Sequence, residues 1–229
     1  MTKVIAYNNL GLHLVLIGEW PRAEQMIERA LEIALREDHV HVAGIYESLG
    51  ELKLLRGELD EAENLLKKAV AFAEDRKHEW YAVQSMRMLA RCYLAQGKFK
   101  SAAKKARETI AKSQAIGDKH YGNMAGLVLA ESLMQQGALE ECEDSLRIIE
   151  ESDPHADFFV LGNIQRIRGL AALAEEDQEL AIHHFSRGLT IFEAAEDIYH
   201  TGLMHFLVGC NLEVRNAARA KRHLTSAAE

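Results

Sequence analysis

The feature that most constrains this chain is a sequence pattern that recurs roughly every 40 residues. Residues 49–69 show one unit: two short amphipathic segments separated by Gly57, each with apolar residues three and four positions apart, as a helix needs to bury one face. Asp60 and Glu63 give the second segment an acidic opening turn, which suits backbone N–H groups without helical partners. A two-helix unit this small cannot bury its apolar stripes alone, so it must pack against neighbours.

Small residues mark the same place in every unit. They are Ala23, Ala62, Ala102, Cys142, Ala181 and Ala220, at successive spacings of 39, 40, 40, 39 and 39 residues. A glycine lies five residues earlier in the first four units, at Gly18, Gly57, Gly97 and Gly137, where we expect the turn between the helices. A large residue followed by a small one precedes these, at Leu10–Gly11, Leu49–Gly50, Leu89–Ala90, Leu129–Ala130, Arg168–Gly169 and Val208–Gly209. Small side chains at these places let neighbouring helices cross closely, so the pattern predicts a stacked helical array.

These marks resemble the tetratricopeptide repeat family. In the third copy they are Leu89, Ala90, Tyr93, Gly97, Phe99 and Ala102, and in the first they are Tyr7, Leu10, Gly11, Leu14, Gly18, Ala23, Ile27 and Ala30. Two departures are the period, which exceeds the 34 residues usual for the family, and the lack of a closing proline, since the chain has only Pro21 and Pro154. The longer period is similar to a variant found in large bacterial regulators and in some cytoskeletal adaptor proteins.

The resemblance covers essentially the whole chain and implies an all-α, right-handed α-solenoid. We expect a single solenoid domain, 1–229, with six helix-turn-helix repeats. The repeats are expected at about residues 3–38, 41–77, 80–117, 121–152, 158–195 and 199–229. By the same resemblance the chain is expected to bind a protein or peptide partner, as the regulatory or sensory region of a larger cytoplasmic bacterial signalling or transcription-regulatory protein.

Composition narrows the classes of partner. The 229 residues are 48% hydrophobic and 27% charged, an ordinary soluble composition. The formal net charge of −8 argues against direct nucleic-acid binding, which needs a basic face. No apolar run reaches eighteen residues, and the start lacks the pattern of a secretory signal, so we expect a cytoplasmic location and no membrane contact.

No known catalytic or cofactor motif is found in the sequence. There is no Gly-rich phosphate loop, nucleophile elbow or HExxH helix, so we predict no enzyme activity and no cofactor. Cys92, Cys142 and Cys210 are far apart and are expected to be buried small residues in a reducing compartment. The connectors REDHVH, EDRKHEW, GDKHY, ESDPHAD and EDIYH each pair Asp with His. Successive connectors are too far apart to share a metal, so we predict cap or turn roles for Asp, exposed histidines and no metal site.

The resemblance implies that the first helices of the repeats line a concave groove. Aligned to the repeat frame, the groove-facing residues are Asn8, Leu12, Glu47, Glu51, Arg87, Arg91, Leu127, Glu131, Arg166 and Leu170. Glu47 and Arg87 hold equivalent places on adjacent helices, as do Glu51 and Arg91, which predicts an acid–base ladder. Two interpretations remain open. The pairs only neutralise one another, or Arg87 and Arg91 bind acidic side chains or a carboxylate of a partner peptide.

Some positions depart from the family pattern. The subgroup that grips a C-terminal carboxylate has Asn where this chain has Leu12 and Glu51, which argues against that activity. Arg168 stands where a large apolar residue is expected, so either its side chain reaches the surface or the fifth repeat is distorted.

The two ends of the array raise a different possibility. The first helix is apolar on every side, and the last repeat has no polar capping helix after it. Either the chain is a fragment of a longer protein, or its ends stack on another copy, which gives the alternative function of a self-assembly module that dimerises through its terminal repeats. A small-molecule sensor that uses the interior of the superhelix is a third possibility, for which the sequence has no distinguishing residue.

Overall fold

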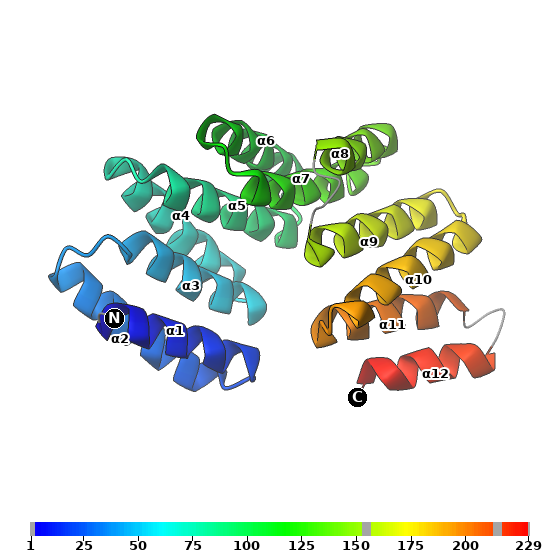
Figure 1. Cartoon of the computed structure of the whole chain (residues 1–229), viewed down its shortest axis with the longest axis horizontal. Coiled ribbons are helices and arrows are strands. Elements are labelled where there is room, and N and C mark those ends of the chain that lie inside the picture. The colour runs from blue at the N-terminus through cyan, green and yellow to red at the C-terminus, as the bar shows by residue number, and fades with distance from the viewer. Residues whose placement is uncertain (1–2, 153–156, 213–216, 229) are drawn as a thin grey trace. The chain divides into compact units, whose positions relative to one another are not determined.

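The computed structural model describes residues 3–152, 157–212 and 217–228. Within these ranges the regular structure consists of twelve α-helices (Figure 1). They are α1 (Lys3–Leu16), α2 (Trp20–Arg36), α3 (Val42–Leu55), α4 (Leu59–Asp75), α5 (Glu79–Ala95), α6 (Phe99–Ile116), α7 (Lys119–Met134), α8 (Leu139–Ser152), α9 (Phe158–Ala174), α10 (Gln178–Ala194), α11 (Ile198–Leu212) and α12 (Ala217–Ala228). The predicted all-α repeat fold is confirmed, with two helices in each expected repeat.

The chain divides into two compact units, residues 1–128 and residues 129–229, with the boundary inside α7. That the whole chain is one continuous solenoid domain stays a prediction.

Unit 1 is built from helix hairpins. Helices α1 and α2, α3 and α4, and α5 and α6 pack as successive pairs, and α2 contacts α3 as α4 contacts α5 (Figure 1). The turn of each hairpin contains a glycine, at Gly18, Gly57 and Gly97 in order. Their φ angles lie between +71° and +77°, a left-handed conformation that glycine adopts without steric cost. The predicted position of these turns is confirmed.

The small residues lie where neighbouring helices approach one another. Ala23, Ala62, Ala102, Cys142, Ala181 and Ala220 are all buried. Gly50 shows why size matters, because a Cβ atom added there would lie 2.7 Å from Leu66 Cγ, closer than two carbon atoms can pack. Their burial is what the predicted packing role requires.

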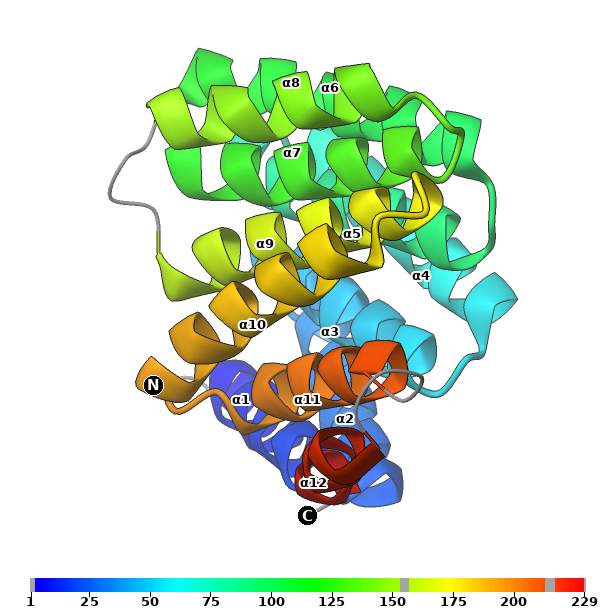
Figure 2. The same ribbon diagram turned by 90° about the vertical axis from the view of Figure 1, so that its right-hand side faces the viewer.

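In unit 2, too, helices approach closely at glycines, but the side chains packed against these glycines are larger. Helices α9 and α10 lie side by side, followed by α11 and α12 (Figure 2). The ring of Phe192 rests on Gly162 and that of Phe185 on Gly169, so that an added Cβ would meet ring carbons at 2.4 and 2.3 Å. Both phenylalanines are fully buried, so the interface between α9 and α10 depends on two aromatic rings that fill the space of missing side chains.

Arg168 does not distort its repeat. Helix α9 runs without a break from Phe158 to Ala174, and the Arg168 side chain turns toward α8. Its guanidinium makes paired hydrogen bonds with Glu143, at 2.6 to 3.2 Å, and with Glu150, at 2.8 and 2.9 Å. An ion pair with two carboxylates therefore takes the place of an apolar contact between α8 and α9. Burial by itself lowers the pKa of Arg168, but the hydrogen bonds to Glu143 and Glu150 outweigh this effect, so the pKa is raised.

One expectation about the cysteines was wrong. Cys92 and Cys142 are buried, but Cys210 is exposed. Met204, Val208 and Leu212 form the buried stripe of α11 at a spacing of four residues, and Cys210 lies between its members on another side of the helix.

The connectors combine cap and turn roles as predicted for aspartate. The carboxylates of Asp118, Asp157 and Asp197 each accept a hydrogen bond at 3.0 Å from a backbone N–H three residues later. Asp38 instead lies in a turn with φ +50° and pairs with Arg76. Residues 153–156 of the connector ESDPHAD lie outside the described residues, and with them His155.

The prediction that the connector histidines are exposed was partly wrong. His120 is exposed, but His41 is half-buried because Nδ1 of its ring contacts the Tyr81 hydroxyl. His200 is also half-buried, since its ring stacks on Phe192 with 4.7 Å between ring centroids.

Ala102→Leu tests the packing at a small-residue position. Ala102 is fully buried on α6, so the larger side chain must push neighbouring helices apart, and we expect a loss of about 1–3 kcal/mol in the free energy of unfolding. The measurement is urea denaturation followed by circular dichroism. Ala115→Leu, at an exposed position of the same helix, is the matched control. Equal unfolding midpoints for the two variants would contradict the packing role.

Candidate partner-binding site

The central pair of the predicted ladder forms and is buried. Arg87 Nη2 on α5 lies 3.5 Å from Glu47 Oε1 on α3, and the two side chains are only 9% and 5% exposed. The Arg87 guanidinium also lies over the ring of Tyr121, with its carbon 5.5 Å from the ring centroid, a cation–π geometry. Arg87 is therefore held between a carboxylate and an aromatic ring and is not available to a partner.

Burial changes the acid–base behaviour of this pair. Removal from water raises the pKa of Glu47 to about 8, because desolvation outweighs the favourable charge of Arg87, while nearby Glu51 raises the pKa further. Among the described residues, Glu47 Oε2, Gln84 Oε1 and Arg87 Nε have no hydrogen-bond partner. The interior of this site is thus polar and incompletely paired, an arrangement that costs stability and that functional positions often retain.

The second pair lies one helical turn further along the same helices. Arg91 Nη1 is 3.8 Å from Glu51 Oε1, and the side chains are 43% and 36% exposed. The structure thus brings both predicted pairs together but gives them different environments. Of the four charged groups, only those of Glu51 and Arg91 are accessible from solvent.

An aromatic row, which we define as His41, Trp80, Tyr81 and Tyr121, borders the buried pair. Adjacent rings lie 5.0 to 5.8 Å apart in edge-on contacts, from His41 to Tyr81, Tyr81 to Trp80, and Trp80 to Tyr121. This row was not predicted from the sequence. Its signal is the period itself, because His41, Tyr81 and Tyr121 follow one another at the same 40-residue spacing that relates Glu47 to Arg87.

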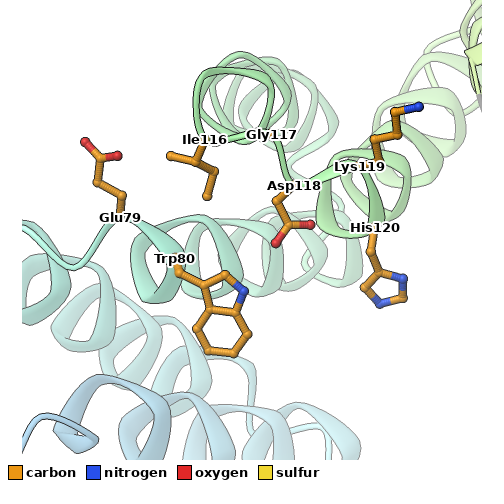
Figure 3. A pocket seen from close by; sticks show the side chains of 7 residues that line it. All are labelled: Glu79, Trp80, Ile116, Gly117, Asp118, Lys119 and His120. Atoms are coloured by element: carbon orange, nitrogen blue, oxygen red, sulfur yellow. The ribbon is translucent and has the colours of Figure 1, made fainter.

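A shallow hollow of about 600 Å³ opens beside the aromatic row, where α5 begins and α6 turns into α7. Figure 3 shows the Asp118 carboxylate between the rings of Trp80 and His120, with the side chains of Glu79 and Lys119 pointing away from it. Trp80 is an exposed large hydrophobic residue, so this rim offers a partner an apolar surface next to charged groups.

Unit 2 carries a further pair that the sequence analysis named only as separate residues. Arg166 on α9 donates hydrogen bonds to both carboxylate oxygens of Glu131 on α7, at 3.2 and 2.5 Å, and its Nε donates to Asn163 Oδ1 at 2.9 Å. The spacing hid this pair, because Arg166 lies one turn before Leu170, the residue that the repeat frame aligns with Glu131. Its long side chain spans that turn.

The remaining predicted groove residues are largely apolar or covered. Leu127 is buried, Asn8 and Leu12 are half-buried, and Leu170 packs against the core of unit 2. Asn8 Oδ1 has no hydrogen-bond partner among the residues that the structure describes. Partner binding by these residues stays a prediction.

Among the described residues, no group of three or more His, Cys, Asp or Glu side chains comes together to hold a metal ion. In the same part of the chain, no helix is both long enough and apolar enough to cross a membrane.

Glu47→Gln tests the protonation of the buried pair. Glutamate has a pKa of about 4.5 when exposed, and burial raises that of Glu47 to about 8, so between these values the folded chain binds more protons than the unfolded chain. Stability from this residue is therefore present at low pH and is lost as pH rises through that window. Gln cannot ionise, so the variant should gain stability relative to wild type as pH rises from 5.5 to 8.5.

The measurement is urea denaturation at both pH values, with Glu51→Gln as the control for losing a carboxylate from an exposed pair. A Glu47→Gln variant that differs from wild type by the same free energy at both pH values would show that Glu47 is charged throughout.

Comparison with known proteins supports the repeat pattern. The tetratricopeptide repeat family profile matches residues 3–75, which contain α1 to α4. A comparison with curated proteins found no significant match.

Among solved structures, the apo form of RapI matches 99% of this chain and 84% of its own, with a TM-score of 0.75 and 13% identity. Aspartyl phosphate phosphatase F from Bacillus subtilis gives a TM-score of 0.77 at 14% identity over 99% of this chain, which spans 59% of that protein. A putative kinesin light chain from Podosopora anserina, with nearly identical TPR-like repeats, gives 0.63 at 17% identity over 84% of this chain and 96% of its own.

At these identities the structures share a fold with this chain and nothing more is carried over. Residues 3–75, the first two repeats, thus match the tetratricopeptide repeat family, and the chain as a whole has an all-α helical-repeat fold similar to that of these structures.

Proposed function

We propose that this chain is a protein-interaction scaffold that holds an extended or helical partner segment along the first helices of its repeats. The observation that carries the proposal is the contrast between two Glu–Arg pairs on the same helices. Glu47 and Arg87 are buried, whereas Glu51 and Arg91, one turn away, are about 40% exposed. The buried pair fixes the helices relative to one another, and the exposed pair presents charged groups to a partner.

The geometry of the exposed pair suits exchange with a partner. At 3.8 Å the Arg91–Glu51 contact is longer than a normal hydrogen bond, and an exposed pair contributes only about 0–1 kcal/mol. A carboxylate of the partner, from an acidic side chain or a chain terminus, can displace Glu51 at little cost. Arg87 is unsuited to this role because its removal from Glu47 leaves a buried acid unpaired.

The proposal includes a regulatory context. We infer a non-catalytic regulatory or sensory region of a larger cytoplasmic bacterial protein, on the long repeat period and on the fold shared with a Bacillus subtilis protein. That neighbour is named a phosphatase, but at 14% identity its activity is not transferred to this chain.

Arg91→Glu tests the scaffold proposal. A partner is first captured from cell extract with the wild-type chain and identified by mass spectrometry, and its affinity for purified variants is then measured by calorimetry. Loss of the guanidinium and repulsion by the new carboxylate should weaken binding about tenfold or more, equal to about 1.4 kcal/mol.

Two further variants separate binding from folding. Arg22→Glu reverses an exposed charge on α2, which is the second helix of its repeat and not one of the first helices proposed to bind the partner. This variant should bind like wild type. The exchange Glu51→Arg with Arg91→Glu keeps an ion pair between the same helices but reverses its direction. The fold is therefore retained, while the positive charge that the partner would bind at position 91 is removed. Wild-type affinity in the exchanged variant would overturn the assignment of Arg91.

The second candidate function is self-assembly through the terminal repeats. It is favoured by large apolar residues left in contact with solvent: Leu10, Leu16 and Ile17 in and after α1, and Ile198, Tyr199 and Phe206 in α11. Such exposure is typical of surfaces that pack against another protein.

Sedimentation velocity over a wide range of concentrations tests this candidate. If the apolar ends pair, the wild type should shift from monomer to dimer with rising concentration, and Ile17→Lys with Ile198→Lys should remain monomeric. Both residues are exposed, so their replacement leaves the core intact. A wild type that stays monomeric at every concentration would exclude self-assembly.

A further inference from the structure

Helix α12 packs closely onto α11 in unit 2. Leu224 rests on Gly209, where an added Cβ would lie 2.8 Å from the leucine side chain, and Ala220 is buried against the same helix. Ala220 belongs to one apolar cluster with Val208 and Leu212. Docking of α12 thus covers the apolar stripe of α11.

A contact between two histidines spans the same interface. His205 Nδ1 on α11 lies 2.9 Å from His223 Nδ1 on α12, and the ring centroids are 5.1 Å apart. One of these nitrogens must accept the hydrogen bond that the other donates, so the contact requires at least one neutral ring. When both rings are protonated, two N–H groups and two positive charges face each other.

The surroundings make the second proton unfavourable. His205 Nε2 lies 3.8 Å from Glu193 Oε1 on α10, which can stabilise one positive charge on the pair. His223 is surrounded by His205 on α11 and by Arg219 and Arg222 on its own helix, with Glu193 as the opposing charge. Burial, and then these positive groups, lower the pKa of His223.

We propose that the His205–His223 contact is an acid-sensitive latch, which holds α12 on α11 while one ring is neutral and releases the helix when both rings are protonated. The direction of the pH dependence follows from linkage. Because the released state binds protons more readily than the docked state, docking of α12 weakens as pH falls. A free helix of twelve residues is marginal in water, so α12 unfolds on release and uncovers Val208 and Leu212.

Hydrogen exchange of the full chain, read by mass spectrometry and corrected for the intrinsic effect of pH, tests the latch. Between pH 7.5 and 5.0 the protection of α12 should fall about tenfold or more while that of α9 and α10 stays constant. His205→Gln with His223→Gln keeps an uncharged hydrogen bond and should remove this pH dependence. His183→Gln, at an exposed position of α10, is the matched control and should behave as wild type.

NMR titration of the wild-type imidazole nitrogens gives a readout independent of the variants. The two rings should titrate in separate steps, with the α12 amide signals lost together with the second step. Wild-type α12 protection that does not change with pH would overturn the latch. So would a single shared titration step, or a double variant that keeps the pH dependence.

Discussion

The close approach of helices at residues without long side chains is the constraint on which this structure depends. Gly50 against Leu66, Gly162 against Phe192 and Gly169 against Phe185 leave no space for a single added carbon. This contact sets the distance between helices within each pair and, through repetition, places residues about 40 positions apart beside one another. Glu47 meets Arg87 for this reason, and His41 meets Tyr81. The chemistry of the candidate site is therefore a consequence of close packing between helix backbones.

The repeat period alone was enough to predict the helix pairs, the glycine turns and the two ion pairs of unit 1, because each depends on which backbone segments are neighbours. It could not predict how far each pair is buried. Glu47–Arg87 and Glu51–Arg91 have the same spacing in sequence, yet the ring of Tyr121 covers Arg87 and leaves Arg91 open. The role of Arg168 was left undecided for a related reason, because it depends on carboxylates of α8 that the pattern of α9 does not specify. The exposure of Cys210 has a different cause, since this residue lies off the buried stripe of its own helix.

Charged side chains serve two purposes in this molecule, and burial decides between them. Arg168 binds two carboxylates on α8, and Arg166 binds Glu131 on α7, so each of them joins α9 to a neighbouring helix. Such pairs are costly to break, since a lone charge then remains in a poorly hydrated place. Arg91 and Glu51 remain hydrated, so they can exchange partners without harm to the fold. In the proposed function, the partner is thus recognised by groups that contribute little to the stability of the fold, so that recognition is separated from folding.

The division of the chain into two units affects how its unfolding can be observed. Both tryptophans, Trp20 and Trp80, belong to unit 1, and unit 2 has none. Intrinsic fluorescence excited at the indole band therefore reports on the first unit alone, whereas the far-ultraviolet dichroism of the helices reports on both. A single denaturation experiment recorded with the two probes compares the cooperativity of the halves directly, and any divergence of the curves measures how independently residues 129–229 unfold.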